Sequence, residues 1–311
     1  MTAIVILNWN GADDTIQCLE SLEHVRGSFF VVIADNGSTD DSVERIREYT
    51  AKSSLDIRLL ELDRNYGFAS GNNKAIKYAA GNNADSYLIL NNDTVVTPGF
   101  LTVLEEFMAA NPKYSILTPR INYYYDRDMI WNCGGVLRLG FRKYRYAGCN
   151  ENKVRGKEYL PISFVTGCAL YFLPSVLQPD GTLFTERFFF GEEDFDFSMR
   201  MKQRGLKMAC VTDSVIYHKV GQAGNQMVKS GKVYLHLLNR YIDIRLNNGR
   251  LFFLLWRIAT YYFTIRALKK AFGSTRQALR KYRFLINDMR SRDGVDRSVF
   301  ESLVIKDDYF K

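Results

Sequence analysis

Short apolar runs alternate with helix-periodic segments along the first 119 residues of the chain. Each run has the length of one buried strand, and the runs are residues 3–7, 29–34, 57–62, 87–90 and 115–117. Between the runs, apolar residues recur every three or four positions, as Ile16, Leu19 and Leu22 do. This alternation predicts an α/β fold with a doubly wound, mostly parallel sheet, whose ligands bind at the carboxyl ends of the strands.

Polar residues follow four of the predicted strands. The clusters occupy positions 8–11, 35–40, 64–67 and 91–93. One such cluster alone is typical of helix caps and turns, whereas four at successive strand ends predict a binding site. There Asp35 can accept a hydrogen bond from a base N–H, and the backbone of residues 67–71 can approach phosphates. Asp93 offers a hard oxygen ligand for Mg²⁺ or Mn²⁺, which neutralises a diphosphate leaving group.

An acidic cluster follows three phenylalanines in the second half of the chain, in the run FFFGEEDFDFSMR at positions 188–200. We expect it to open a helix, whose dipole stabilises negative charge at this end. Within it, Asp196 is expected to form an exposed ion pair with Arg200 one turn ahead. The three carboxylates of residues 192–194 lie so close to the phenylalanines that part of the group must face apolar surface. Such surroundings raise a carboxylate pKa toward a general-base role.

Residues 208–218 form the last predicted strand, after a helix that ends at Gly205. This strand places His218 at its carboxyl end. A single histidine in such a position is more often structural than a metal ligand, so the residues alone leave both roles open for His218.

Several common motifs are missing from the sequence. No GxGxxG follows the first strand, no GxxxxGK[ST] occurs and no GxSxG accompanies the three histidines, which counts against a dehydrogenase, a P-loop NTPase and a serine hydrolase. A nucleotidyltransferase would prefer a basic glycine-rich loop near the N-terminus, which is absent as well. The five cysteines form no CxxC pair and are odd in number, so we expect buried or free thiols. The start of the chain lacks a basic signal-peptide region, which predicts a cytoplasmic protein.

Positive charge is concentrated near the C-terminus. Residues 240–292 hold 13 Lys and Arg against two Asp, a net charge of +11, whereas the remaining chain carries −3. An anionic partner is therefore expected. The apolar run 251–266 contains Arg257 and is shorter than the about 20 residues that span a bilayer, so it predicts a helix lying flat on an anionic surface.

This surface would be the inner face of the cytoplasmic membrane. The alternative is that the run packs against the catalytic body or forms a homodimer contact. Nucleic acid is not an expected partner, because the basic residues are mixed with an apolar helix rather than placed among isolated aromatics on strands.

Five stretches of the sequence together resemble family 2 glycosyltransferases, especially the bacterial rhamnosyltransferase-like members of polysaccharide assembly. They are VILNWNGADDTIQCLESL, VVIADNGSTDDSVERI, LDRNYGFASGNNKAI, YLILNNDTVV, and FFFGEEDFDFSMRMKQRG with the later VIYHKVG. The resemblance covers about residues 2 to 220. It implies the GT-A fold, with a nucleotide-sugar-binding half over 1–120, a smaller acceptor-side and catalytic half over 121–221, and a basic helical extension over 222–311.

The resemblance also implies an activity. A sugar would pass from a nucleotide-sugar donor, dTDP-rhamnose or a UDP-sugar, to a hydroxyl group of a glycan or lipid-linked acceptor with inversion. Residues 181–186 depart from the family's Gly-x-Phe-Asp-Glu, so the acceptor side is expected to differ. The alternative function is a non-catalytic nucleotide- or sugar-binding subunit of a polysaccharide assembly complex.

The matching positions imply roles for single residues. Asp194 of the Glu193-Asp194 pair would be the catalytic base. The Asn-Asn-Asp sequence would be a variant of the metal-binding DxD motif, with Asp93 and His218 at one Mg²⁺ or Mn²⁺ and its diphosphate. The donor-binding residues would be Asn8, Asn10, Asp35, Asn65, Gly71, Asn72 and Asn92.

Overall fold

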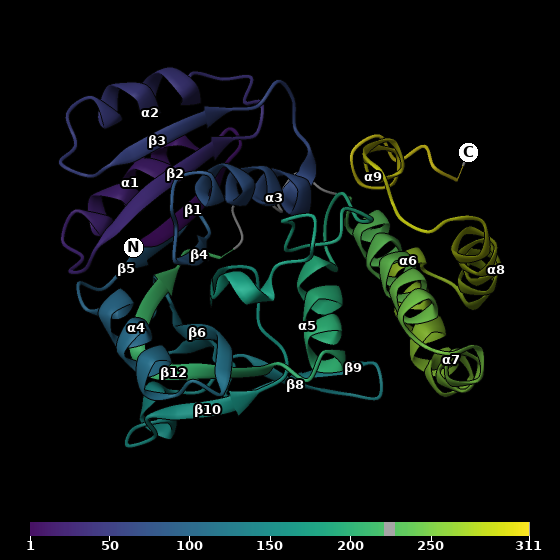
Figure 1. The fold of residues 1–311 in the computed structure, drawn as a ribbon. Coiled ribbons are helices and arrows are strands. Elements are labelled where there is room, and N and C mark those ends of the chain that lie inside the picture. Colours follow the sequence, from purple (N-terminus) through teal and green to yellow (C-terminus); the bar gives the residue numbers. More distant parts are fainter. Residues whose placement is uncertain (221–227, 311) are drawn as a thin grey trace.

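The computed structural model describes residues 1–220 and 228–310, which form an α/β body with a group of C-terminal helices beside it (Figure 1). Strands and helices alternate along the first part of the chain, as predicted. The elements are β1 (Thr2–Asn8), α1 (Ala12–Leu22), β2 (Phe29–Asp35), α2 (Ser42–Thr50), β3 (Ile57–Glu61), α3 (Gly67–Ala80), β4 (Ser86–Leu90), β5 (Thr94–Val96) and α4 (Phe100–Ala110).

The second part of the body is richer in strands. Its elements are β6 (Tyr114–Tyr123), β7 (Ile130–Asn132), β8 (Gly135–Arg138), β9 (Phe141–Tyr144), β10 (Tyr159–Ile162), β11 (Ala169–Phe172), α5 (Glu193–Gln203) and β12 (Lys207–His218), with short 3₁₀ turns at Glu151–Lys153 and Pro174–Val176. The predicted acidic helix is therefore α5, and the predicted strand that ends at His218 is β12. Gly205, with a φ of 72°, lies just beyond the end of α5.

Ten of the described strands join in one sheet with the order β10-β12-β6-β11-β4-β1-β2-β3, while β5 pairs with β12 and β7 with β6. The strands β3, β2, β1 and β4 are parallel neighbours, and β12 is parallel to β6. The prediction of a doubly wound, mostly parallel sheet is confirmed, with β11 inserted antiparallel between β4 and β6. Because β6 crosses position 120, the sheet continues from one predicted half into the other.

Side chains of the central strands alternate between two apolar cores. In β1, Ala3 and Val5 face the core that contains apolar residues of α3, whereas Ile4 and Ile6 face the core that contains those of α1 and α4. The period of two along a strand produces this division. Both faces of the parallel strands are thus covered, and only their ends are available to a ligand.

The C-terminal helices are α6 (Lys229–Asn247), α7 (Arg250–Phe272), α8 (Thr275–Ser291) and α9 (Arg297–Val304). They pack around a third core, in which Tyr234, Leu238 and Tyr241 of α6 meet Phe188 and Phe195 from the region of α5. In Figure 1, α5 stands between the sheet and α6. The extension therefore shares apolar contacts with the acidic segment.

Helix α7 is longer than the apolar run that suggested it. It has 23 residues, and within the described chain it is the one helix whose length and composition would suffice to cross a membrane. One stripe of α7 is buried against its neighbours. The opposite stripe is exposed and apolar, and its members include Leu251, Leu255, Ile258 and Tyr262.

The cysteines are all free thiols, and four of the five are buried. The expectation of buried or free thiols is thereby confirmed. Burial of an uncharged thiol is favourable because it behaves as a small apolar group.

Candidate active site

Asn8 and Asp35 lie side by side at the carboxyl ends of two parallel strands. Asp35 is 1% exposed, and its carboxylate accepts hydrogen bonds from Asn8 Nδ2 at 2.7 Å and from the backbone N and hydroxyl of Ser38 at 2.8 and 2.7 Å. Asn8 is itself buried, and its Oδ1 accepts a bond from Thr15 at 2.8 Å. The side chain of Asn8 thus fixes the orientation of Asp35.

Asn10 joins the loop after β1 to the loop after β2. Its Oδ1 accepts a hydrogen bond from the backbone N of Thr39 at 2.8 Å, and its backbone N donates to the Ser38 hydroxyl at 2.9 Å. Asn10 has a φ of 50°, in the left-handed region that asparagine tolerates better than most residues. The preceding Trp9 is 53% exposed, so an aromatic ring stands at the rim of the strand ends.

The start of α3 lies next to the loop after β2. Asn65 Oδ1 accepts hydrogen bonds from Gly67 N at 2.8 Å and from Asn36 Nδ2 at 3.1 Å. Gly67 has a φ of 82°, and a Cβ on it would lie 2.3 Å from the carbonyl oxygen of Phe189. Only glycine fits this contact, which joins the start of α3 to the loop that precedes α5.

Two further predicted donor residues lie one turn along α3. Gly71 is buried, and a Cβ on it would lie 2.6 Å from Leu7, so it permits the close approach of α3 to β1. Asn72 is 1% exposed, donates to the Phe68 carbonyl at 2.9 Å, and has an Oδ1 without a hydrogen-bond partner among the described residues.

Asp93 and His218 are in direct contact. His218 Nε2 lies 3.0 Å from Asp93 Oδ1, and the backbone N of Lys219 donates to the Asp93 carbonyl at 3.0 Å. The His218 ring packs edge-on against Trp131 with 4.4 Å between the ring centroids. Asn92 points the other way, toward α1, and donates to the Thr15 hydroxyl at 3.1 Å.

These side chains suit a divalent cation. A carboxylate and an imidazole are both ligands of Mn²⁺, and Mg²⁺ in such sites takes one or two carboxylates with the remaining positions filled by phosphate and water. The side chain of Asp93 is 22% exposed, and His218 Nδ1 is buried without a hydrogen-bond partner in the described structure. Within the described residues, no group of three or more His, Cys, Asp and Glu side chains is placed to hold a metal. The remaining ligands therefore have to come from a bound diphosphate or water.

The acidic cluster occupies the N-cap and the first turn of α5. Glu192 has a left-handed φ of 93° and is buried, whereas the side chain of Asp194 is 22% exposed. Arg142 of β9 lies 3.7 Å from Asp194 Oδ1. Glu193 Oε2 is buried and has no hydrogen-bond partner in the described chain.

The two carboxyl groups of Glu193 and Asp194 have separated pKa values. Burial raises the pKa of Glu193 to about 8, and the charge of Asp194 adds to the rise. Burial also raises the pKa of Asp194, but the opposing charge of Arg142 limits it to about 6. At pH 7 Glu193 is therefore mostly neutral while Asp194 is mostly ionised, so the two neighbouring carboxyl groups differ in protonation state.

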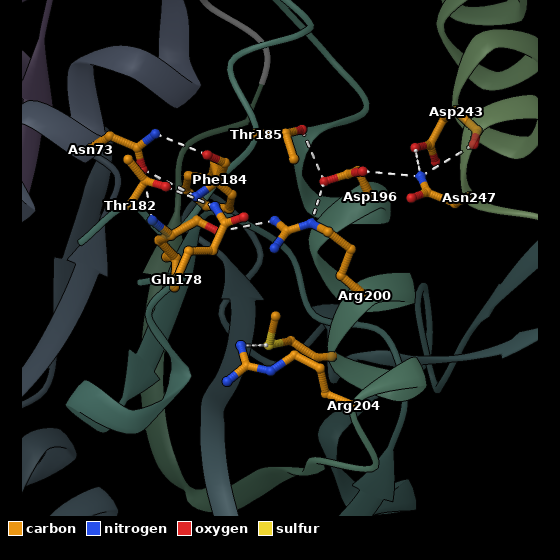
Figure 2. A network of polar contacts seen from close by, with 12 residues as sticks. Asn73, Gln178, Thr182, Phe184, Thr185, Asp196, Arg200, Arg204, Asp243 and Asn247 are labelled. Atoms are coloured by element: carbon orange, nitrogen blue, oxygen red, sulfur yellow. Dashed lines mark hydrogen bonds and ion pairs between the residues drawn. The ribbon is translucent and has the colours of Figure 1, made fainter. Parts of the chain in front are cut away.

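The prediction for Asp196 is half correct. It pairs with Arg200 at 2.8 Å, as the spacing predicted, but its side chain is completely buried, so the expected exposure is wrong. The cause is packing from outside α5: Asp196 also accepts hydrogen bonds from Thr185 at 3.0 Å and from Asn247 of α6 at 3.1 Å. Figure 2 shows this network, which runs from Asn73 of α3 through residues 182–185 and α5 to α6.

Sequence reasoning missed two arginines of this site. Arg142 contacts Asp194, and Arg240 of α6 forms a bidentate ion pair with Glu192. The only signal for a buried carboxylate was the crowding of acidic residues behind three phenylalanines. No local pattern identifies a cation that comes from 48 residues further along the chain.

Comparison with known proteins identifies the family. A family model described as "Glycosyl transferase family 2" matches residues 3–178. The chain belongs to this family. It is also similar to a "Teichoic acid poly(glycerol phosphate) polymerase" from Staphylococcus epidermidis, with 25% identity over 186 residues that make up 52% of this chain and 25% of the relative. The chain thus matches about a quarter of the length of that curated relative.

Solved structures of similar shape include a mannosyltransferase and TarS. The mannosyltransferase PcManGT from Pyrobaculum calidifontis, in complex with GDP-Man and Mn²⁺, has a TM-score of 0.59 at 17% identity, over 87% of this chain and 72% of that one. TarS 1-349 from S. aureus, in complex with UDP-GlcNAc, has a TM-score of 0.56 at 16% identity, over 97% and 90% of the two chains. At these identities the likeness concerns the fold, and it confirms the GT-A prediction for this family 2 glycosyltransferase.

Proposed function

We propose that this family 2 glycosyltransferase moves a sugar from a nucleotide-sugar donor to an acceptor hydroxyl group with inversion, and that Asp194 is the base. The proposal depends above all on the contrast between two neighbouring carboxyl groups. At pH 7 Glu193 is mostly neutral, whereas Asp194 is mostly ionised and keeps 22% of its side chain exposed. An ionised, partly exposed carboxylate at the start of a helix can accept a proton from a bound hydroxyl group.

The reaction is a single displacement. Asp194 takes the proton of the acceptor hydroxyl group while the hydroxyl oxygen forms a bond to the anomeric carbon. The bond from that carbon to the diphosphate oxygen breaks, and its electron pair leaves with the nucleoside diphosphate. Because the attacking and leaving oxygens are on opposite faces of the sugar, the anomeric configuration inverts.

The donor half of the site would lie at the ends of β1, β2 and β4. Asp35, held by Asn8 and Ser38, offers its carboxylate to the base, and Trp9 and Asn10 border the same edge. The start of α3 offers backbone N–H groups and a favourable dipole to phosphates. We infer a UDP-sugar or dTDP-rhamnose as the donor, and the UDP-GlcNAc complex of TarS supports a uridine nucleotide.

Asp93 and His218 would hold Mg²⁺ or Mn²⁺ against the donor diphosphate. When bound, the ion would neutralise the charge that develops on the departing diphosphate. The two side chains come from the loop after β4 and the end of β12, so the sheet fixes their separation. The presence of Mn²⁺ in the mannosyltransferase of similar fold supports this assignment.

An apolar cavity beside the segment that precedes α5 supports a lipid-linked acceptor. The cavity has a volume of about 560 Å³ and is lined by Phe190, Gly191 and residues of α6 and α7. Lys229, Lys232 and His236 border it, and neither lysine makes an ion pair within the described residues. Positions 221–227 contain no acidic residue that could neutralise them. A phosphate ester on an apolar chain has the matching chemistry, because its charge meets the lysines and its chain the apolar lining.

We also propose that the extension docks on the inner face of the cytoplasmic membrane. The exposed stripe of α7 presents Leu255 at 58% and Ile258 at 64% exposure. Beside it, Arg257, Arg283 and Arg290 line a cavity of about 310 Å³ between α7 and α8. In the described part of the chain none of these arginines has an acidic partner. Apolar side chains next to unpaired cations suit the boundary of a bilayer with anionic headgroups.

A donor panel tests the proposed function. Thermal unfolding is followed with dTDP-rhamnose, UDP-sugars and GDP-mannose, each with and without Mn²⁺, because a ligand that binds only the folded protein raises its stability. The stabilising donor is then incubated with glycan and alkyl-phosphate-linked acceptors, and nucleoside diphosphate release is measured. We expect one nucleotide class to stabilise in the presence of Mn²⁺ and to turn over. A donor that stabilises the protein but is never consumed would favour the non-catalytic subunit.

A further inference from the structure

We propose that Arg240 of α6 is a positioning residue for the Asp194 carboxylate, and that it acts through its ion pair with Glu192. The C-terminal extension then forms part of the catalytic apparatus instead of serving only for attachment. The inference rests on the proposed role of Asp194 as the base. It goes beyond that role because it explains how the base is held.

The Glu192–Arg240 pair is buried and bidentate. The side chain of Glu192 has 0% exposure and that of Arg240 has 13%. Arg240 Nε donates to Glu192 Oε1, and Arg240 Nη2 donates to Oε2 at 3.2 Å. The guanidinium also lies 3.5 Å from the centre of the Phe195 ring, in the first turn of α5. A planar guanidinium with two donors and a stacked face fixes its partner in one orientation, which a lysine cannot do.

The backbone around Glu192 depends on the same helix. Asn239, the neighbour of Arg240, donates from Nδ2 to the carbonyl oxygens of Phe190 at 3.0 Å and Gly191 at 2.7 Å. Residues 190, 191 and 192 are therefore all held by α6. Glu192 needs this support because its φ of 93° lies in a region that residues with a side chain rarely adopt.

Glu192 in turn sets the direction of α5. Its carbonyl oxygen accepts the hydrogen bonds of Phe195 N at 3.0 Å and Asp196 N at 2.9 Å, which are the first of the helix. Asp194 lies within this turn, two residues after Glu192. A displacement of Glu192 therefore moves the proposed base with the helix start, and an error of 1 Å in a reacting group can lower a rate about 100-fold.

The Glu192–Arg240 pair also affects the pKa of Asp194. Burial raises its pKa, Arg142 lowers it, Glu192 raises it and Arg240 lowers it. Among the described residues, the charged or titratable groups around this region include Arg142 and Tyr144 of β9, Glu192 and Glu193 of the same segment, and His236, Arg240 and Asp243 of α6. Removing one charge of the Glu192–Arg240 pair thus changes the pKa of Asp194 in a direction that depends on which charge is lost.

The experiment compares Arg240→Gln, Arg240→Lys, Glu192→Gln and the double variant E192Q/R240Q in the full-length protein. Arg245→Gln is the matched control, because Arg245 is also on α6 but pairs with Asp293, at 2.6 Å, and not with Glu192. Donor affinity, kcat, KM for the acceptor and the pH profile of kcat/KM are measured for each. Circular dichroism at the assay temperature reports the folded fraction.

We expect Arg240→Gln to lower kcat between about 10-fold and 100-fold with little change in donor affinity, and Arg245→Gln to leave kcat near that of the native protein. The acidic limb of the kcat/KM profile should move to higher pH in Arg240→Gln and to lower pH in Glu192→Gln. In the double variant it should lie between these two positions, closer to that of the native protein. Arg240→Lys keeps the charge but loses the bidentate geometry, so kcat should fall while the limb stays in place.

Two results would overturn the inference. One is a kcat for Arg240→Gln that equals that of Arg245→Gln. The other is a shift of the acidic limb in the same direction in Arg240→Gln and Glu192→Gln. If Arg240→Gln does not fold, Arg240→Lys and Glu192→Gln decide by the same criteria. The variant Asp194→Asn, measured in parallel, separates the proposed base from the proposed positioning role. Normal transfer by Asp194→Asn refutes the base. If Asp194→Asn loses transfer while Arg240→Gln transfers normally, only the positioning role is refuted.

Discussion

The ring of His218 and the carboxylate of Asp93 lie 3.0 Å apart, although 125 positions separate the two residues in the sequence. Strand β12 ends at His218, and β5 begins immediately after Asp93. The antiparallel pairing of His218 with Thr94 brings the two side chains together. A contact set by strand register has little freedom to rearrange, which suits a pair of metal ligands.

Replacing Asp93 with Ala should abolish the Mn²⁺-dependent part of donor binding. The variant loses one of the two proposed protein ligands, so donor affinity measured by calorimetry with Mn²⁺ should fall by the order of 10- to 100-fold, and affinity without the metal should change little. Asp13→Asn is a suitable control, since that aspartate is 86% exposed and pairs with Arg45. Equal Mn²⁺ enhancement in Asp93→Ala and the native protein would contradict the assignment.

Replacing Asp194 with Asn should retain the fold and donor affinity but lower transfer by about 100-fold or more, the scale of lost general-base catalysis. Glu193→Gln is the informative partner, because Glu193 is already neutral at pH 7 and glutamine reproduces its size. If Glu193→Gln loses transfer while Asp194→Asn keeps it, the base is Glu193. If Asp194→Asn loses donor binding instead, Asp194 is a binding residue.

The pH profile should report the same carboxylate. Asp194 accepts a proton only when ionised, and burial places its pKa at about 6, so kcat/KM should rise with pH and level off above that value. An Arg142→Gln variant removes a charge that lowers this pKa and should shift the limb to higher pH. A limb near pH 4 in the native protein, the ordinary range of an exposed aspartate, would contradict the environment described for Asp194.

Stability should fall as the pH rises, because Asp243 of α6 is a buried carboxyl group with a raised pKa. Burial is the main cause, and the nearby Asp196 adds to it. A group whose pKa is higher in the folded state contributes stability that is complete below its unfolded pKa and is lost as the pH rises through the folded value. We expect the melting temperature to decrease from about pH 5 toward pH 9, and to decrease less in Asp243→Asn.

Asp213 provides the comparison for this measurement, because it is exposed and lies on β12, away from α6. Asp213→Asn should show the same slope of melting temperature against pH as the native protein. A slope unchanged in Asp243→Asn would show that Asp243 is ionised in the folded state.

The donor-side framework could be predicted from sequence because its determinants are local. The apolar runs defined β1 to β4, and once these strands are parallel their carboxyl ends bring Asn8, Asp35 and Asp93 to one edge. What the pattern could not show is that Asn8 is buried and supports Asp35. That distinction depends on Thr15 and Ser38, which share the hydrogen bonds of the two side chains.

The acidic segment of residues 192–196 was less predictable because its surroundings come from distant segments. The spacing of Asp196 and Arg200 predicted their pairing, but the burial of Asp196 accompanies contacts from outside α5, with Thr185 and with Asn247 of α6. The pairing of Glu192 with Arg240 has no local signature either, since the helix dipole seemed a sufficient explanation for an acidic residue at this position. Both omissions arise from the extension, whose packing on α5 follows from tertiary contacts in the third core.

The exposed stripe of α7 should determine membrane attachment. Replacing Leu255 and Ile258 together with Glu adds negative charge to a surface that would meet acyl chains and anionic headgroups, so co-sedimentation with phosphatidylglycerol-containing vesicles should be lost. Tyr125→Glu is the control, because Tyr125 is 74% exposed but lies between β6 and β7. Binding by the native protein should weaken with added salt. If the native protein ignores anionic vesicles and the double variant instead reduces the mass measured by light scattering, the stripe is a homodimer contact.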